Sequence, residues 1–269
     1  RITVLADNTV AARSARGEHG LCIHIESGGR RLLFDTGQGL VLTDNARALA
    51  IDISAVDTIV LSHGHYDHTG GLPTVLAAAR SSVTVHAHPD ALQPKYHGTR
   101  AIGMPPATRD SLNTPACGLL LSREPGEIAP GISRTGEIPR MHIEETPEEI
   151  FHLDPEGKTP DPLLDDQSLY IGTPQGTVVL LGCAHAGVAN ILDHVRRLTD
   201  NRPIRAVLGG LHLGAASSVR VQWMLDSLRR IAPRLLVPMH CTGIKAATAL
   251  WHEFPDACRS GGAGSVFEF

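Results

Sequence analysis

The sequence predicts an α/β protein in which two β-sheets stack face to face with helices on the outside. Each half of the chain opens with paired strands, and alternating strands and helices follow. In the first half, a strand at 57–61, a helix at 72–79 and a strand at 83–86 form a β–α–β unit, which requires parallel strands. No linker composition separates the halves, so residues 1–269 are expected to form one domain.

The first half begins with β-prone segments. Ile2–Leu5 is apolar, and Leu21–Glu26 and Arg31–Asp35 lie on either side of the turn residues Ser27–Arg30, which predicts a hairpin. A helix is expected over 40–49, after the glycine-containing break that ends the hairpin. These elements lead directly into the β–α–β unit.

The second half repeats this order. The expected elements are a hairpin of strands 168–171 and 177–181, a helix at 188–198, a strand at 205–208, a helix at 217–231, a strand at 235–237, a helix at 243–252 and an edge strand at 265–269. Two insertions, 94–116 and 144–166, lack periodicity and contain several prolines. Long segments of this kind are often lids or substrate loops, although plain surface loops are the alternative.

Composition narrows the class of protein. The chain is 42% apolar, with a net charge of −4 and no basic stripe, so nucleic acid is not an expected partner. No apolar stretch approaches the roughly 18–20 residues of a membrane span. The five cysteines are odd in number and form no Cys-x-x-Cys pair, which is typical of reduced thiols in the cytoplasm.

The loop after strand 57–61 carries the most informative pattern. It reads Ser-His-Gly-His-Tyr-Asp-His-Thr-Gly-Gly and contains four metal-binding side chains within six residues: His63, His65, Asp67 and His68. Imidazole nitrogens and a carboxylate suit a divalent transition metal such as zinc, iron or manganese. Four donors this close would crowd one ion, which predicts two adjacent metal sites. A histidine-rich surface tract is the alternative, but the buried strand before the loop favours an organised structure.

This His-x-His-x-Asp-His loop after a buried strand resembles the metallo-β-lactamase superfamily. Three further segments occur in the superfamily's order, namely Leu33–Gly37, Gly182–His185 and Met239–Gly243, so the resemblance covers nearly the whole chain. It implies a four-layer αββα sandwich with a dinuclear metal site at the edge of the two sheets. Further segments are similar to one branch, which includes an archaeal dihydropterin ribofuranosyl-aminobenzene phosphate synthase and bacterial metal-dependent hydrolases: Asp7–Asn8, Glu18–Leu21, Asp165–Gln167 and Gly209–Leu213.

The resemblance also implies ligands for two divalent ions, with zinc as the first choice. One ion would be held by His63, His65 and His185, and the other by Asp67, His68 and His240. His185 and His240 each follow a buried strand, although a solvated histidine is the alternative for both. Asp35 resembles an outer carboxylate that orients a metal-binding histidine by accepting its N–H, with a turn cap as the alternative.

One part of the superfamily's pattern is absent. An aspartate that bridges both metals usually lies between the last two histidine ligands, but the matching strand end at 207–212 has no carboxylate. His212 stands there instead, as a ligand, a substrate contact or a structural histidine. Cys183 and Cys241 are close to expected ligands, and thiolates bind zinc, although buried structural thiols are the alternative. The occupancy of the second metal site therefore stays open.

The predicted function is a metal-dependent hydrolase, in which a metal-activated hydroxide attacks an ester, lactone or phosphate bond of a small molecule. Asp67 would also accept a proton, and His212 is a second catalytic candidate. The alternatives are a transferase resembling the pterin-phosphate synthase, an iron-dependent redox enzyme and a non-catalytic binding protein. A homodimer is an option. Five basic residues either contact a substrate phosphate or carboxylate or lie solvated at the surface: Lys95, Arg100, Arg109, Arg140 and Lys245.

Overall fold

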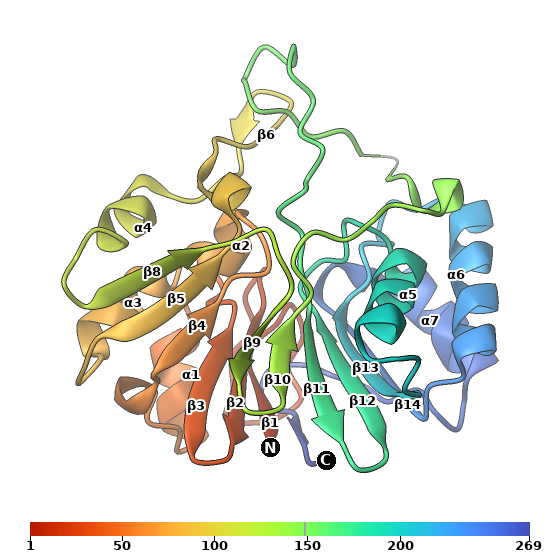
Figure 1. The fold of residues 1–269 in the computed structure, drawn as a ribbon, viewed down its shortest axis with the longest axis horizontal. Coiled ribbons are helices and arrows are strands. Elements are labelled where there is room, and N and C mark those ends of the chain that lie inside the picture. Colours follow the sequence, from red (N-terminus) through yellow and green to blue (C-terminus); the bar gives the residue numbers. More distant parts are fainter. Residues whose placement is uncertain (148) are drawn as a thin grey trace. The chain divides into compact units, whose positions relative to one another are not determined.

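The computed structural model describes residues 1–147 and 149–269, which form two compact units (Figure 1). Unit 1 consists of Arg1–Arg123, Phe151–Asp165 and Gly261–Phe269, and unit 2 of Glu124–Ile150 and Asp166–Ser260. Position 148, inside the predicted insertion 144–166, lies outside the described residues. Neither unit is continuous in sequence. Whether the whole chain folds as one domain is a separate question, and the single domain expected from the sequence stays a prediction.

Unit 1 contains a seven-stranded mixed sheet in the order β15-β1-β2-β3-β4-β5-β8. Its strands are β1 (Ile2–Ala6), β2 (Cys22–Ser27), β3 (Arg30–Phe34), β4 (Thr58–Val60), β5 (Val83–Ala87), β8 (Cys117–Leu121) and β15 (Val266–Phe267). The first four strands of this order pair antiparallel, whereas β3, β4, β5 and β8 run parallel. The parallel β4–β5 pair confirms the predicted β–α–β unit, and β15 confirms the predicted edge strand.

Helices cover one face of this sheet through an apolar core. They are α1 (Leu42–Ala48), α3 (Leu72–Ala78) and α4 (Pro106–Ser111), while the short α2 (Tyr66–Thr69) belongs to the histidine loop. In β5 alternate residues contribute to this core, namely Val83, Val85 and Ala87, and the helices add Leu42 and Val75. Full burial of such a side chain contributes about 1.5–3 kcal/mol.

The insertion 94–116 is more regular than its sequence predicts. It forms a small hairpin of β6 (Tyr96–His97) and β7 (Arg100–Ala101), followed by helix α4. Gly98 has a φ of 58°, which the tight turn of the hairpin requires. Proline in the first turn of α4 presets the helical φ. The insertion is therefore ordered although it lacks apolar periodicity, because turn and proline chemistry organises it.

Unit 2 contains a six-stranded mixed sheet in the order β14-β13-β12-β11-β10-β9. Its strands are β9 (Gly126–Ala129), β10 (Ile132–Arg134), β11 (Leu169–Thr173), β12 (Gly176–Leu181), β13 (Ile204–Gly210) and β14 (Leu235–Met239). Strands β9 to β12 pair antiparallel, and β12 to β14 run parallel. The hairpin and both later strands were predicted from the sequence, whereas β9 and β10 were not.

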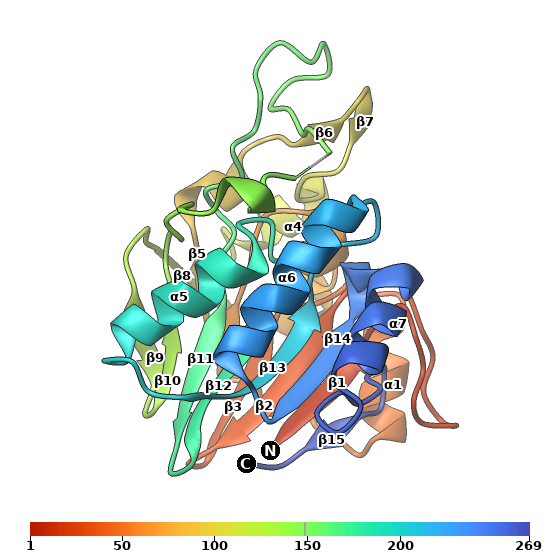
Figure 2. The same cartoon turned by 90° about the vertical axis from the view of Figure 1, so that its right-hand side faces the viewer.

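Three amphipathic helices pack on one face of this second sheet (Figure 2). They are α5 (Val188–Leu198), α6 (Ser218–Ile231) and α7 (Ile244–Glu253), at the positions that the sequence predicts. Two mixed sheets with helices confirm the predicted α/β fold class. No helix in the described parts of the chain combines the length and the apolar character that crossing a membrane requires.

Candidate metal centre

Several of the predicted site residues follow parallel strands, at their carboxyl ends. In unit 1, Asp35 comes directly after β3, and His63 opens the loop after β4. In unit 2, the strands β12, β13 and β14 lead into His185, His212 and His240. Parallel strands end at the same edge of a sheet, where α/β proteins commonly bind their ligands. The sheet topology therefore gathers the candidate side chains of each unit at one edge.

The first pair of nitrogens in unit 1 belongs to His63 and His65. Their facing atoms, His63 Nε2 and His65 Nδ1, are 2.9 Å apart, and the other ring nitrogen of His63 lies 2.9 Å from Ser62 Oγ. Zinc binds imidazole nitrogen at about 2.0–2.1 Å, so two tetrahedral nitrogen ligands lie about 3.3 Å apart. The spacing of the two nitrogens thus fits two ligands of one ion.

A second group of donors in unit 1 forms around Asp67. Its Oδ2 lies 3.8 Å from His68 Nε2 and 3.3 Å from His19 Nε2. Asn8 Nδ2 contacts the other ring nitrogen of His19 at 3.2 Å. His19 was not among the predicted ligands. His19 lies on the loop between β1 and β2, far along the chain from Asp67, so the sequence does not reveal their contact. Its only sequence signal is its place in a segment similar to one branch of the superfamily.

Asp35 makes the contacts that its predicted orienting role requires. It is fully buried, and its Oδ2 lies 2.7 Å from His68 Nδ1. Its carboxylate also accepts the backbone N–H and the hydroxyl of Ser62, both at 2.7 Å. A carboxylate that accepts one imidazole N–H fixes the tautomer and leaves the lone pair of the other nitrogen for a metal. The nitrogen so prepared is His68 Nε2, the atom that faces Asp67.

Two consecutive carboxylates hold the two metal-binding loops in place. In unit 1, Asp165 Oδ2 accepts the backbone N–H of Gly64 at 2.8 Å, between the first two histidines of the loop. In unit 2, Asp166 Oδ2 accepts the N–H of Ala186 at 2.9 Å, directly after the predicted ligand of that loop. Both aspartates are buried. In the sequence these aspartates stand out only as part of a segment similar to one branch of the superfamily, and the structure shows that they anchor the two loops.

Asp165 also belongs to a buried charge cluster. Lys95 Nζ lies 2.9 Å from Asp165 Oδ1 and 2.7 Å from Asp161 Oδ2. Burial alone would lower the pKa of Lys95, but Asp165 and Asp161 outweigh it and raise this pKa above its usual value. Lys95 was predicted as a phosphate contact or a solvated charge. The solvated alternative is wrong, because the ammonium is buried and paired with both carboxylates within unit 1, and the substrate contact stays a prediction.

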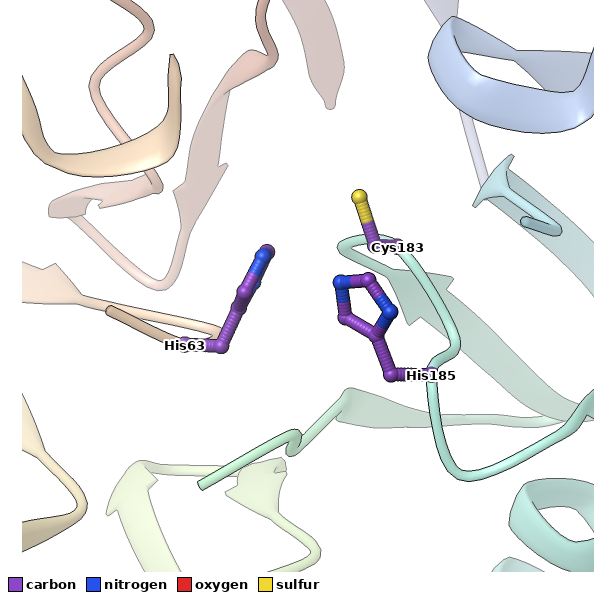
Figure 3. Close-up of side chains that lie close together, drawn as sticks. All are labelled: His63, Cys183 and His185. Carbon is purple, nitrogen blue, oxygen red and sulfur yellow. The ribbon is translucent and has the colours of Figure 1, made fainter. Parts of the chain in front are cut away.

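The candidate donors of unit 2 include sulfur. Cys183 and His185 lie on the same loop after β12 (Figure 3). The rings of His185 and His212 are 4.2 Å apart between centroids. Cys183, His212 and Cys241 each offer a ligand atom, and these three atoms lie within 4.8 Å of one another. The unit thus combines imidazole and thiol donors.

The surroundings of Cys241 in unit 2 favour its thiolate form, which is the form of sulfur that binds metal. Burial would raise the pKa of Cys241, but hydrogen bonding with Cys183 and His212 outweighs it and lowers this pKa well below its usual range. Burial would lower the pKa of His212, but Cys241 and Glu149 raise it instead. Glu149 Oε2 lies 3.2 Å from His212 Nε2. No sequence motif points to Glu149, which lies in the insertion 144–166.

Backbone strain coincides with these strand ends. Asp35, Ala184, His212 and His240 have positive φ angles of 61°, 59°, 48° and 49°. Such conformations cost of order 1–3 kcal/mol in residues other than glycine and persist where the surrounding structure enforces them. In this chain they turn the backbone sharply after β3, β12, β13 and β14, directly beside or at the candidate donors.

Comparison with known proteins identifies the family. Residues 15–240 match the model of the metallo-beta-lactamase superfamily, and the chain belongs to this superfamily. Its members are mostly metal-dependent hydrolases. The predicted family is therefore confirmed, and with it a fold that holds divalent metals, often zinc.

Three individual proteins are similar over nearly their whole length. The uncharacterized protein MJ0448 of Methanocaldococcus jannaschii is 35% identical over 250 residues, 93% of each chain. The 7,8-dihydropterin-6-methyl-4-(beta-D-ribofuranosyl)-aminobenzene-5'-phosphate synthase of the same archaeon is 28% identical over 267 residues, 94% of this chain and 90% of that one. The solved structure of Tm1679, described as a metal-dependent hydrolase of the beta-lactamase superfamily, matches with a TM-score of 0.86 at 31% identity, covering 100% of this chain and 98% of that one.

The side chains present fit divalent transition metals. Imidazole nitrogens, a carboxylate oxygen and sulfur atoms are the donor types that zinc and iron accept, and in unit 1 their spacing suits a shared ion. Hydrogen-bonded carboxylates orient or anchor the loops that carry them. The assignment of His63, His65, Asp67, His68, His185 and His240 to two ions, and the catalytic roles of Asp67 and His212, stay predictions.

Proposed function

We propose that this protein is a metal-dependent hydrolase that cleaves an ester, lactone or phosphate bond in a small molecule. The observation that carries the proposal is the oriented donor set: His63 Nε2 and His65 Nδ1 stand 2.9 Å apart, and Asp35 fixes His68 so that its Nε2 faces Asp67. Membership of the superfamily and the description of Tm1679 support it. A cytoplasmic location is proposed on the cysteine pattern of the sequence.

The proposal uses two divalent ions, most simply zinc, with iron or manganese as alternatives. The ligands would be His63, His65 and His185 for one ion, and Asp67, His68 and His240 for the other. When bound, such ions lower the pKa of water from 15.7 to about 7 and polarise the oxygen of the bond under attack.

The residues of the chain have separate tasks in this reaction. Asp67, 7% exposed, presents a carboxylate that accepts a proton as the attacking group forms. Asp35 keeps His68 in one tautomer, and Asp165 and Asp166 keep the two loops from shifting. This division of labour accounts for the buried carboxylates beside the two loops: their hydrogen bonds hold His68 and the backbone of each loop in place before the substrate arrives.

A cavity in unit 1 supports a small molecule as the substrate. It has a volume of about 490 Å³ and is lined by residues of the insertion 94–116 and by Tyr66, which directly follows His65. Ligand pockets for small molecules span roughly 300–1,000 Å³. Tyr96 and Met104 give the cavity an apolar wall, and Arg109 adds a cation that suits a phosphate or carboxylate. This arrangement supports a substrate-binding role for the insertion.

A transferase reaction is the second candidate. It is favoured by the relative of Methanocaldococcus jannaschii named as a pterin-phosphate synthase, which is 28% identical over 94% of this chain. The tyrosines and Arg109 of the cavity also suit a planar ring that carries phosphate. This candidate predicts binding of a pterin diphosphate without turnover of simple esters.

The two candidates are separated by metal analysis followed by a substrate panel. Protein purified without added metal is expected to contain zinc, iron or manganese, and to hydrolyse lactones, aryl esters or phosphodiesters. His65→Ala should lose metal and turnover, whereas His252→Ala, an exposed residue at the end of α7, should retain both. Full metal content and full turnover in His65→Ala would contradict the proposal. Inactivity on the whole panel with pterin diphosphate binding would favour the transferase.

A further inference from the structure

The loop after β13 lacks the bridging carboxylate of the superfamily's pattern and brings a different set of atoms together. Residues 211–217 read Leu-His-Leu-Gly-Ala-Ala-Ser. Within unit 2, His212 from this loop, Cys183 from the loop after β12 and Cys241 from the segment after β14 offer three donor atoms that lie within 4.8 Å of one another. Three neighbouring strands thus contribute one soft or borderline donor each.

The three strand ends are tied together by contacts to sulfur. The backbone N–H of His212 donates to Cys241 Sγ at 3.3 Å, and the thiol of Cys241 donates to the carbonyl oxygen of Cys183 at 3.5 Å. Zinc–sulfur bonds of about 2.3 Å and zinc–nitrogen bonds of about 2.0–2.1 Å place tetrahedral S and N ligands roughly 3.5–3.8 Å apart. To enclose one ion, the three donor atoms would close from their observed separations of up to 4.8 Å to these values.

The backbone is built to allow this approach. A Cβ at Gly210 would lie 2.6 Å from Cys241 Sγ and 2.5 Å from the carbonyl oxygen of Gly182, so only glycine leaves room for the sulfur. His212 and His240 both have positive φ angles, and these sharp turns direct the chain after β13 and β14. The positive φ angles of His212 and His240 and the missing side chain of Gly210 together allow Cys241 to contact the loop of His212.

We propose that Cys183, Cys241 and His212 form a site that binds a divalent ion through two thiolates and one imidazole. These ligands take the place of the carboxylate that is missing from the loop after β13. This inference rests on the proposed function, because it supplies ligands for one of the two ions. Two thiolates and one imidazole favour Zn²⁺ or Co²⁺ over the hard ions Mn²⁺ and Mg²⁺. The site therefore also assigns the metal preference of the enzyme.

Cobalt substitution tests this site without measuring activity. Metal-free protein is titrated with Co²⁺, the number of bound ions is measured by elemental analysis, and absorption is recorded in the near ultraviolet, where thiolate-to-Co²⁺ charge transfer appears. A charge-transfer band that grows with the bound cobalt is expected in the unaltered protein. Cys183→Ser and Cys241→Ser should each weaken the band and lower Zn²⁺ affinity about tenfold or more, as for lost metal-site contacts. Cys117→Ser, partly exposed in β8, is the matched control and should change neither.

The outcomes separate this inference from the proposed function. Stoichiometric cobalt without a charge-transfer band in the unaltered protein would overturn the thiolate site and leave the metal-dependent hydrolase standing. Failure to bind cobalt, zinc or manganese at all would overturn both. Because the spectrum of the unaltered protein decides the question, a cysteine variant that fails to fold does not obscure the result. A band that persists unchanged in both folded serine variants would also contradict the assignment.

Discussion

Replacing Lys95 by methionine tests whether the buried charge cluster holds the metal-binding loop of unit 1. Lys95 is 1% exposed, and its ammonium lies 2.7 Å from Asp161 and 2.9 Å from Asp165. Methionine fills a similar volume but removes the charge. Two carboxylates, both almost without solvent contact, then remain buried without a cation. One of them is the acceptor of the Gly64 N–H inside the histidine loop.

The expected loss of stability follows from this geometry. Removing one partner of a buried ion pair costs about 3–5 kcal/mol, because the remaining charge is left uncompensated. We expect the upper half of this range, since two carboxylates lose the same cation. Each 1.4 kcal/mol is a factor of ten in an equilibrium constant, so a loss of about 4 kcal/mol lowers the folding equilibrium constant roughly 10³-fold. That is a large share of the roughly 5–15 kcal/mol of a typical domain.

Urea unfolding of the full chain measures this loss from the transition midpoint and slope. The triple variant Lys95→Met/Asp161→Asn/Asp165→Asn is the critical comparison, because it removes the stranded charges and keeps an acceptor for Gly64. It should recover more than half of the stability lost in the single variant. A loss below about 1 kcal/mol in Lys95→Met, the value typical of exposed pairs, would refute the reasoning. A triple variant no more stable than the single one would also refute it.

Three further predictions follow from the site and its surroundings. Asp35→Asn should weaken metal binding about 10–100-fold, because the contact at His68 Nδ1 loses its charge. Competition against a chromogenic chelator measures the affinity, and an unchanged affinity would contradict the orienting role of Asp35. Asp154, whose carboxylate accepts the backbone N–H groups of Lys158 and Thr159, should titrate with a pKa of about 2 by NMR, a value lowered by these hydrogen bonds. The contribution of Asp154 to stability is present above the unfolded pKa of about 3.9 and is lost as pH falls towards 2. Titration of Asp154 at the ordinary pKa would contradict these hydrogen bonds. Chelator treatment should abolish turnover, and added Zn²⁺ should restore it; full activity in the treated protein, with metal absent by elemental analysis, would exclude a catalytic metal.

Strongly periodic segments made much of the fold predictable. The helix predicted at 188–198 is α5 itself, and the apolar runs of β4 and β12 identified buried strands. Strands β8, β9 and β10 escaped prediction because they are short, rich in glycine or only partly buried, so they show no clear alternation. Their position is fixed by pairing with β5 and β11, which a local pattern does not reveal.

The candidate site was predictable where its residues are close in sequence. The donors from His63 to His68 stand in one loop, and a motif of this kind indicates a metal by itself. His19 and the anchors Asp165 and Lys95 reach the same loop only through the tertiary fold. Lys95 and Asp165 are 70 positions apart, and no composition or spacing predicts that their charges meet. The supporting network therefore had to be seen in the structure.

X-ray diffraction with anomalous scattering at the zinc edge tests the central proposal most directly. Crystals of the zinc-loaded chain should show an anomalous peak with His63 Nε2, His65 and His185 at about 2.0–2.1 Å from it. A neighbouring peak should contact Asp67, His68 and His240. Absence of any peak beside these residues in zinc-loaded crystals, or zinc bound only elsewhere on the chain, would contradict the account.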